Sequence, residues 1–246
     1  LRINVQLVKA ADGYCMWSDT YNRTLTDIFR IQEDIARSVA DALEATLLGQ
    51  DLPPTQKTNA RTYNAYLQGK YFAQRLGQAD LRQAAAYLER AIAADSTYAP
   101  AWAWLGLTYS FQAEQGYTPL PEGFSRARRA SERSLEFDEN LAVAYAALGY
   151  VQKNFDWDWT GASATYQKAL ALEPNNAAVL EHTASIAMTL GRIEESGEQY
   201  RRSIEIDPLV PRTHYLLGVW ALYCNKLLDA EEAFKRALEL HPEYPN

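Results

Sequence analysis

The sequence predicts an all-α protein, an α-α superhelix of stacked helical hairpins, preceded by a small N-terminal β-hairpin plus helix. The main observation is a repeat: Pro174, Pro208 and Pro242 each follow a helical pattern and stand 34 residues apart. Proline lacks a backbone N–H and has a fixed φ, so it marks a helix end. A fixed period near this length is typical of stacked helical hairpins.

A small residue recurs where the first helix of each predicted hairpin must approach the second. The five positions are Gly69, Gly106, Gly149, Ala184 and Gly218. They divide an array expected over residues 62–246 into five hairpins, at about 62–96, 97–139, 140–174, 175–208 and 209–242. Apolar residues around these positions supply the core that joins one hairpin to the next.

The first fifty residues follow another pattern. Apolar and polar residues alternate from Arg2 to Leu7, which predicts a strand with one buried face. Asp12-Gly13 predicts a hairpin turn, and an apolar stripe predicts a helix at about 27–48. We therefore expect a β-hairpin and helix over residues 1–50, and a proline-containing linker at 51–61.

The repeat resembles the tetratricopeptide repeat (TPR), whose pattern is W-x2-L-G-x2-Y, then A-x3-F-x2-A, then P. Residues 102–109 (WAWLGLTY) match the first part, and residues 230–237 (AEEAFKRA) with Pro242 match the second. The resemblance covers about residues 62–246. It implies a non-enzymatic module that binds peptides or proteins.

Residues 1–50 resemble the end of a TolB-like domain. The motif Trp17-Ser18-Asp19-x-Tyr21-x-Arg23, followed by Asp27-Ile28-Phe29, carries this resemblance. In bacterial signalling proteins such a domain precedes TPR arrays and follows a class III adenylate or guanylate cyclase domain, or a winged-helix DNA-binding domain. A hairpin with one helix is marginal alone, so further strands are expected upstream or from a second chain.

The two resemblances together imply the regulatory C-terminal region of a bacterial signalling protein, such as a class III adenylate cyclase. The alternatives are the sensor half of a winged-helix transcriptional regulator and a free-standing TPR assembly scaffold. The three interpretations differ in what lies upstream of this chain.

Composition disfavours several function classes. The 24 Lys and Arg residues against 31 Asp and Glu residues give a net charge of −7, which is unfavourable for a nucleic-acid groove. Two cysteines cannot form a disulfide framework and fit a reducing, cytoplasmic location. The longest apolar run, residues 215–224, is shorter than the roughly 20 residues that cross a bilayer, so no membrane contact is expected in this segment.

No motif predicts catalysis. His182, His214 and His241 form no metal-binding arrangement with a carboxylate or with one another. His214 takes the place of an aromatic residue between helices, so a core role is expected for it. We expect no enzyme, no metal and no cofactor in this chain.

The concave face of the superhelix is the predicted binding site, for a peptide or protein ligand. Counting around each first helix from its packing residues gives the residues expected to line this groove: Tyr66, Lys70, Ala103, Leu107, Tyr150, Lys153, Asn154, Glu181, Ser185, Arg212, Tyr215, Val219 and Tyr223. Tyrosines with a few charges suit peptide recognition. The alternative is that these residues only solvate or pack the groove.

Two other surfaces are candidates for binding. Residues 112–123 are rich in turn formers and predict a surface loop, either near a binding face or as a tolerated insertion. The fifth hairpin has no polar capping helix after it, so its outer face is expected to be partly apolar. A homodimer is expected through that face or through the open edge of the N-terminal strand.

The third hairpin has a distinctive inner turn. Trp157 and Trp159 are expected to fill the gap between adjacent hairpins, with a ligand-binding cage as the alternative. Asp158 is expected to cap the helix that begins at about Trp159.

Overall fold

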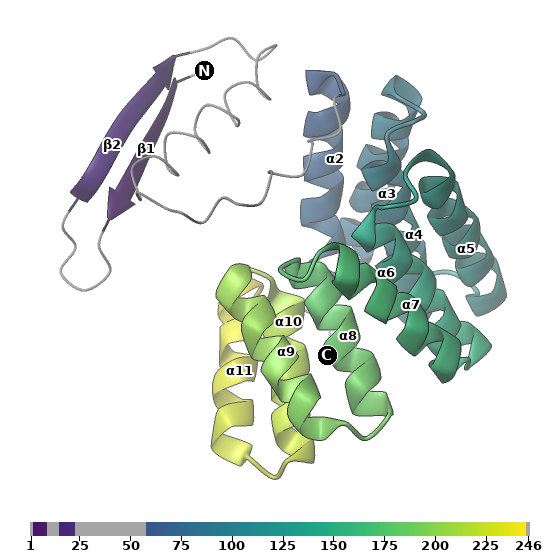
Figure 1. Ribbon diagram of the computed structural model, residues 1–246, viewed down its shortest axis with the longest axis vertical. Helices are drawn as coiled ribbons and strands as arrows, with labels where there is room; N and C mark the ends of the chain where they lie inside the picture. The colour runs from purple at the N-terminus through teal and green to yellow at the C-terminus, as the bar shows by residue number, and fades with distance from the viewer. Residues whose placement is uncertain (1, 9–14, 23–57, 245–246) are drawn as a thin grey trace. The chain divides into compact units, whose positions relative to one another are not determined.

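The chain divides into two compact units, Leu1–Tyr63 and Asn64–Asn246. The computed structural model describes residues 2–8, 15–22 and 58–244 (Figure 1). Each unit is described by itself.

The first unit contains an antiparallel pair of strands. Strand β1 (Arg2–Val8) pairs with β2 (Cys15–Asn22), and the register shifts between Leu7 and Val8. The turn expected at Asp12-Gly13 and the helix expected at about 27–48 lie outside the described residues. The N-terminal hairpin plus helix and its TolB-like origin therefore stay predictions.

The second unit is a series of helical hairpins. Its helices are α2 (Ala60–Ala73), α3 (Gln78–Ala94), α4 (Ala99–Glu114), α5 (Leu120–Phe137), α6 (Ala142–Val151) continued by the π-helical turn η2 (Gln152–Asp156), α7 (Trp159–Leu172), α8 (Ala177–Thr189), α9 (Ile193–Ile206), α10 (Pro211–Tyr223) and α11 (Leu227–Leu240). Within residues 58–244 they pair as five hairpins, which confirms the all-α array (Figure 1). None of the described helices is long and apolar enough to cross a membrane.

The helices form two layers. The first helices α4, α6, α8 and α10 contact one another in this order along the array, and they form the inner layer. The second helices α3, α5, α7 and α9 each pack on the first helix of the following hairpin. This nearest-neighbour stacking is what gives a helical repeat array its continuous core.

Close approach within a hairpin depends on the small residue that the sequence places there. A Cβ built on Gly149 would lie 2.8 Å from the ring of Tyr166, and one on Gly218 would lie 2.5 Å from the ring of Phe234. A larger residue at either position would push the two helices apart. The expected role of the recurring small residue is confirmed at these positions.

A polar atom at the start of the first helix ties it to the preceding turn. Trp102 Nε1 donates to the carbonyl of Ser96 at 2.9 Å, and Tyr145 Oη donates to the carbonyl of Glu139 at 2.8 Å. His214 occupies the same place, and its Nε2 lies 2.9 Å from the carbonyl of Pro208. A carbonyl only accepts, so Nε2 carries the proton. His214 is buried, and its expected core role is confirmed.

Side-chain oxygens cap the starts of α2, α7 and α8. At α2, Asn59 Oδ1 accepts the N–H of Thr62 at 2.9 Å. Asp158 Oδ1 accepts the backbone N–H of Gly161 at 2.8 Å, which confirms the cap expected for α7. Asn176 Oδ1 accepts the N–H of Ala178 at 3.0 Å at the start of α8.

Residues 112–123 differ from the expectation of a surface loop. Helix α4 continues to Glu114 and α5 begins at Leu120, so most of the inserted sequence is helical. Gln112 is buried, and its Nε2 donates to the carbonyl of Leu81 at 3.1 Å. Prolines at the start of α5 are compatible with a helix because first-turn N–H groups have no intrahelical partner. The insertion lengthens two helices, and the loop prediction was wrong.

The two tryptophans of the third hairpin do not fill a gap between hairpins. Trp157 is 71% exposed and Trp159 is 40% exposed. The packing role falls to Phe155, whose ring stacks on Phe124 of α5 at a centroid distance of 5.1 Å. The π-helical turn η2 places Phe155 there by adding a residue to the hairpin.

The two ends of the array meet. Arg75, in the turn after α2, donates through Nη2 to Nδ1 of His241, which follows α11, at 3.2 Å. Nε2 of His241 lies 3.6 Å from Asp80 Oδ2. The preceding turn has an acidic residue at this place, Asp207, whose Oδ1 accepts the N–H of Leu209 at 3.4 Å. His241 thus stands where Asp207 stands one repeat earlier. Asp207 bonds within its own turn, whereas His241 bonds to the first hairpin of the array.

Candidate functional site

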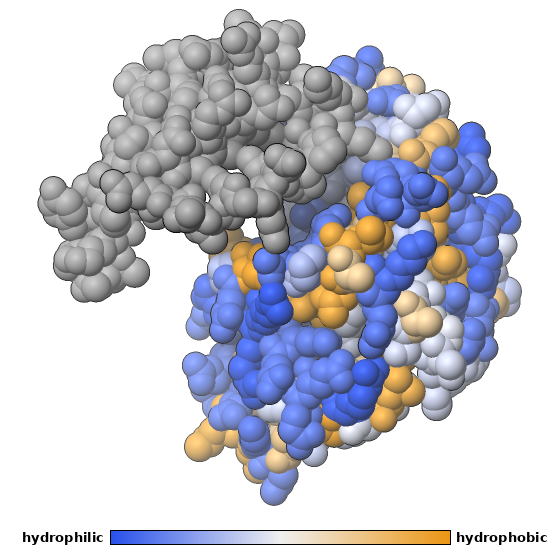
Figure 2. All heavy atoms as spheres, viewed as in Figure 1, coloured by the Kyte–Doolittle hydropathy of each residue, from blue (hydrophilic) through white to orange (hydrophobic). Residues whose placement is uncertain are grey.

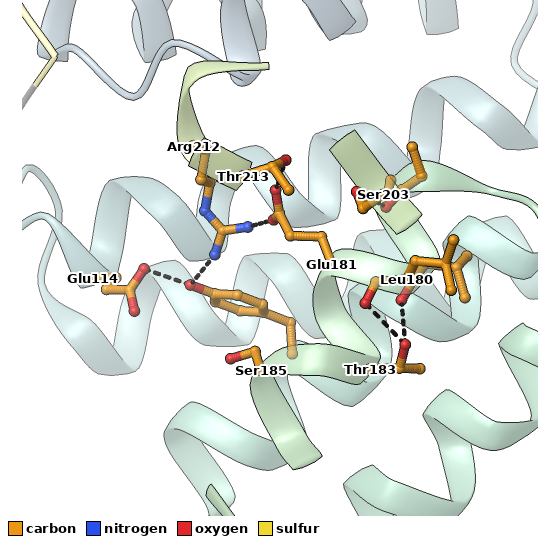
Figure 3. A network of polar contacts seen from close by, with 12 residues as sticks. Glu114, Leu180, Glu181, Thr183, Ser185, Ser203, Arg212 and Thr213 are labelled. Carbon is orange, nitrogen blue, oxygen red and sulfur yellow. Dashed lines mark hydrogen bonds and ion pairs between the residues drawn. The ribbon is translucent and has the colours of Figure 1, made fainter. Parts of the chain in front are cut away.

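A buried polar network lies on the inner layer and draws on four first helices (Figure 3). Arg212 is the second residue of α10, and its guanidinium forms an ion pair with Glu181 of α8. Thr213 Oγ1 donates to the second oxygen of Glu181 at 2.6 Å. Tyr150 Oη lies 3.5 Å from Arg212 Nη2 and donates its own proton to Glu114 of α4.

The Arg212–Glu181 pair is closed off from solvent. Arg212 is 8% exposed and Glu181 is 5% exposed. The guanidinium also lies over the ring of Phe111, 4.8 Å from its centroid, which adds a cation–π contact across the array. Because buried charges need partners, removing either residue would leave the other as an unpaired buried ion.

Tyr150 acts as a neutral donor in this network. Burial raises the pKa of its hydroxyl well above the usual value, and the charge of Glu114 raises it further. The hydroxyl therefore keeps its proton at neutral pH and can bridge Glu114 to the Arg212 side of the network. Arg212 opposes this pKa shift without reversing it.

Lys153 is a cation without a carboxylate partner among the described residues. Its Nζ donates to Ser185 Oγ of α8 at 2.7 Å, and no ion pair with a described residue accompanies this bond. Burial lowers the pKa of Lys153 to about 8; the charge of Arg212 also lowers it, and Glu114 partly opposes the shift. This ammonium group is a ready contact for an added carboxylate.

His182 belongs to the core beneath this site. It is 2% exposed, its ring stacks on Tyr166 at 6.1 Å, and it meets Tyr150 edge-on at 5.4 Å. Burial lowers its pKa to about 3, and the charge of Lys153 contributes. His182 is therefore neutral at physiological pH and supports the orientation of Tyr150.

The structure brings together some of the predicted groove residues. Tyr150, Glu181 and Arg212 share one network, and Lys153 pairs with Ser185. Asn154 lies beside them, because its Nδ2 donates to the carbonyl of Tyr150 at 3.1 Å.

Other predicted residues make separate contacts. Tyr66 meets Tyr98 edge-on at 5.4 Å, and Lys70 lies 5.5 Å from the ring centroid of Trp104. Tyr215 packs between Phe234 and Tyr244 at 5.7 and 5.5 Å.

The exposure of the remaining predicted residues varies widely. Tyr223 is 76% exposed and Val219 is half-buried, whereas Ala103 and Leu107 are fully buried. The predicted set therefore mixes residues that pack inside the array with residues that a partner could reach.

Sequence reasoning missed Glu114 and Phe111. Both lie near the end of α4. Glu114 lies in the stretch extended by the insertion, whereas Phe111 follows Gly106 by five residues, the offset at which the predicted groove residue Tyr223 follows Gly218. The acidic and aromatic side chains at helical spacing were the available signal. Neither has a feature that would show its contact with α10 from sequence.

This arrangement can bind but shows no catalytic constellation. Within residues 2–8, 15–22 and 58–244, no group of three or more His, Cys, Asp or Glu side chains could hold a metal ion. Within the network, Arg212 is paired with Glu181. Lys153 is the cation of the site that has no carboxylate partner among the described residues.

Comparison with known proteins supports the repeat assignment. Residues 158–211 match the family model of the tetratricopeptide repeat. This segment covers α7, α8, α9 and the start of α10.

Two relatives differ in how much of the chain they match. The putative adenylate cyclase 3 of Rhizobium meliloti is 25% identical over 234 residues, which is 95% of this chain and 29% of that protein. The type IV pilus assembly protein PilF of Pseudomonas aeruginosa is 31% identical over 146 residues, which is 55% of this chain and 56% of that protein. The chain thus spans less than two thirds of either relative.

A solved structure shows the same fold. TTC0263, a thermophilic TPR protein of Thermus thermophilus, aligns with a TM-score of 0.54 and 16% identity, covering 74% of this chain and 92% of that one. At this identity the likeness concerns the fold alone. Residues 158–211 thus match the tetratricopeptide-repeat family model, and the helical hairpins of residues 60–240 have the fold of a TPR protein.

Proposed function

We propose that this TPR array is the regulatory, protein-binding region of a nucleotide cyclase, and that it receives its partner on the inner face around Arg212. The observation that carries the proposal is the convergence of side chains from α4, α6, α8 and α10 at one place. A partner that contacts this place bears on four hairpins together.

The inner face favours a partner segment with an acidic group. Arg212 and Tyr150 are held in position by their hydrogen-bonded partners within the network. Lys153 donates its hydrogen bond to the hydroxyl of Ser185 and has no carboxylate partner among the described residues. A carboxylate placed near Lys153 would supply the missing counter-charge in a site that is partly shielded from water, where charge-assisted hydrogen bonds are strong. Tyr223 offers exposed aromatic area on the same predicted face.

The cyclase part of the proposal is supported by the extent of one similarity. The match to the putative adenylate cyclase of Rhizobium meliloti covers 95% of this chain, so it spans both units. It covers 29% of that protein, which leaves most of the relative outside the match. The array would then bias an effector that lies elsewhere in the parent protein.

A scaffold for assembling other proteins is the second candidate. The similarity to the pilus assembly protein PilF favours it, at 31% identity over 146 residues. Under this hypothesis the inner face still binds a partner, but no cyclase activity depends on it.

The first test addresses the inner face. Peptides selected from a display library against the wild-type chain would be measured on Lys153→Met and Tyr223→Ala variants, with Leu120→Glu on α5 as the exposed control. We expect at least about tenfold weaker binding for the inner-face variants, the loss typical of a binding hot spot. Unchanged affinity in both variants, with helical content intact, would rule out the inner face as the binding site.

The second test separates the two candidate functions. Cyclic-nucleotide production would be compared between the full-length parent and the parent lacking residues 64–246. A change of severalfold supports a regulatory region, and an active but unaffected enzyme contradicts it. If the full-length parent has no cyclase activity, the assembly scaffold is the function that stands.

Two further expectations remain proposals. Light scattering over a dilution series tests the homodimer expected through the N-terminal strand edge or the fifth hairpin. Fractionation of the source cells tests the cytoplasmic location.

A further inference from the structure

A groove of about 790 Å³ lies on the opposite side of α10 from the Arg212 network. Its floor includes His214, Leu217 and Ala221, spaced three and four residues apart along the helix. Arg212 and Tyr215 fall on the other face of α10 by the same helical period. The groove is therefore distinct from the inner face described above.

Helices α9 and α11 form the walls. Trp220 completes the floor, with its Nε1 donating to the carbonyl of Ile193 at 2.8 Å and its ring under the guanidinium of Arg201 at 4.8 Å. Leu228, at the start of α11, stands at the rim and is 80% exposed. Figure 2 shows apolar surface along the lower edge of the array, where Figure 1 places the turns of the fourth and fifth hairpins.

The preceding hairpin shows that the fold does not require these apolar residues. Leu228 follows Glu194 by one 34-residue period, so the equivalent exposed position of α9 carries a charge. Leu217 likewise follows Thr183 by one period. Leu227 and Leu228 are neighbours at the start of α11 and are 64% and 80% exposed, and contiguous exposed apolar surface is a feature of binding sites.

The α11 side of the groove carries unpaired negative charge. Glu231 pairs with Lys235 at 2.6 Å, and Glu239 lies on the same helix as its partner Arg236. Asp229 and Glu232 also line the groove and form no ion pair with any described residue. A complementary partner would bring positive charge to this side.

We propose that this groove binds an amphipathic helix of a partner protein. The helix would set apolar side chains on Leu217 and Leu228, and a Lys or Arg against Asp229 and Glu232. The three- and four-residue spacing of the floor runs for about two helical turns, which matches the spacing of anchors on a docked helix. This inference goes beyond the proposed function because it uses another face.

The probe is a designed, fluorescein-labelled 14-residue helical peptide with leucines at positions i, i+3 and i+7 and lysines on either side. Its binding to the full 246-residue chain would be followed by fluorescence anisotropy at low and high salt. We expect Leu228→Glu to weaken binding at least about tenfold, since it places a charge against the apolar anchors. The matched control Leu120→Glu changes another exposed leucine and should leave binding unchanged.

The charges are tested by reversal. Asp229→Lys/Glu232→Lys should weaken the lysine peptide and lessen its dependence on salt, because charge attraction at an exposed site is screened. A peptide with glutamates in place of the lysines should bind this double variant better than it binds the wild type. Lys153→Met on the inner face should leave all of these affinities unchanged, so this inference can fail or hold independently of the proposed function.

Several outcomes would overturn the inference. If the wild-type chain does not bind the lysine peptide, the proposed docking site is wrong. It is also wrong if Leu228→Glu binds this peptide as well as the wild type does. If the lysine and glutamate peptides bind the wild type equally well, the inference that the partner helix is basic is wrong. Circular dichroism of each variant verifies that its helices are intact.

Discussion

At the scale of single residues, the cations of the inner face differ in whether they have a charged partner. Arg212 and Glu181 neutralise one another within the array, whereas Lys153 has a hydroxyl partner and no described counterion. The two cations thus have different roles although both lie on the predicted groove. Arg212 connects helices, and Lys153 remains available to a ligand.

Lys153 predicts a dependence of stability on pH. Its folded-state pKa of about 8 lies below the ordinary 10.5, so between these values the unfolded chain holds a proton that the native protein has released. The free energy of unfolding should therefore rise with pH in this window relative to Lys153→Met, by on the order of 2 kcal/mol. Urea denaturation at pH 7 to 10 measures it.

Buried tyrosines limit the useful range of this experiment. The pKa of Tyr150 is raised, so above about pH 10 the unfolded chain loses the tyrosine proton first and stability falls. The comparison is therefore made below pH 10 as the difference between wild type and Lys153→Met. Parallel stability profiles for the two proteins would contradict the lowered pKa of Lys153.

At the scale of elements, the array is shaped by how closely its helices approach. Gly197 of α9 is buried, and a Cβ built there would overlap the Trp220 ring of α10. This contact joins the fourth hairpin to the fifth. It also positions Trp220 in the floor of the groove between α9 and α11. A single glycine therefore affects both the stacking of hairpins and the proposed docking site.

Gly197→Ala should destabilise the protein by about 1–3 kcal/mol, because the added methyl group forces Trp220 or α10 to move. The gain in helix propensity, up to about 1 kcal/mol, offsets part of this. Urea denaturation followed by circular dichroism measures the change. Glu198→Ala, the exposed neighbour on the same helix, is the control and should stay within about 0.5 kcal/mol of wild type. Equal stability of the two variants would mean that α9 and α10 can separate freely.

At the scale of the whole molecule, the second unit is a closed array. Arg75 and Asp80 of the first hairpin meet His241 after the last helix, and Arg212 of α10 reaches Phe111 of α4. These contacts bring together residues from opposite ends of the repeat series. The closed array encloses the Arg212–Glu181 pair, whereas Tyr223 on the predicted groove is 76% exposed.

Removing the end contact should open the array. We expect Arg75→Met/His241→Ala to give a larger radius of gyration in small-angle X-ray scattering, because a net hydrogen-bond contribution of about 1 kcal/mol to closure is lost. Arg129→Met is the control, since Arg129 bonds to Ser125 within its own helix. If the scattering of Arg75→Met/His241→Ala matches that of wild type, other contacts are sufficient for closure.

Much of the array could be predicted from local pattern. The helices of the hairpins, the cap at Asp158 and the core place of His214 are all local properties, and each is confirmed. The partly apolar outer face of the fifth hairpin is also confirmed, with Leu227 64% and Leu238 42% exposed. These features depend on side chains a few residues apart, so sequence spacing contains the information.

The sequence by itself determined the repeated helical hairpins, because helix period, glycine contacts and turn chemistry act over short distances along the chain. Only the tertiary structure decided that the insertion extends α4 and α5, that Glu114 joins the Arg212 network, and that His241 meets Arg75. These outcomes depend on the angle between successive hairpins. Small packing differences accumulate over five hairpins, and no local pattern records their sum.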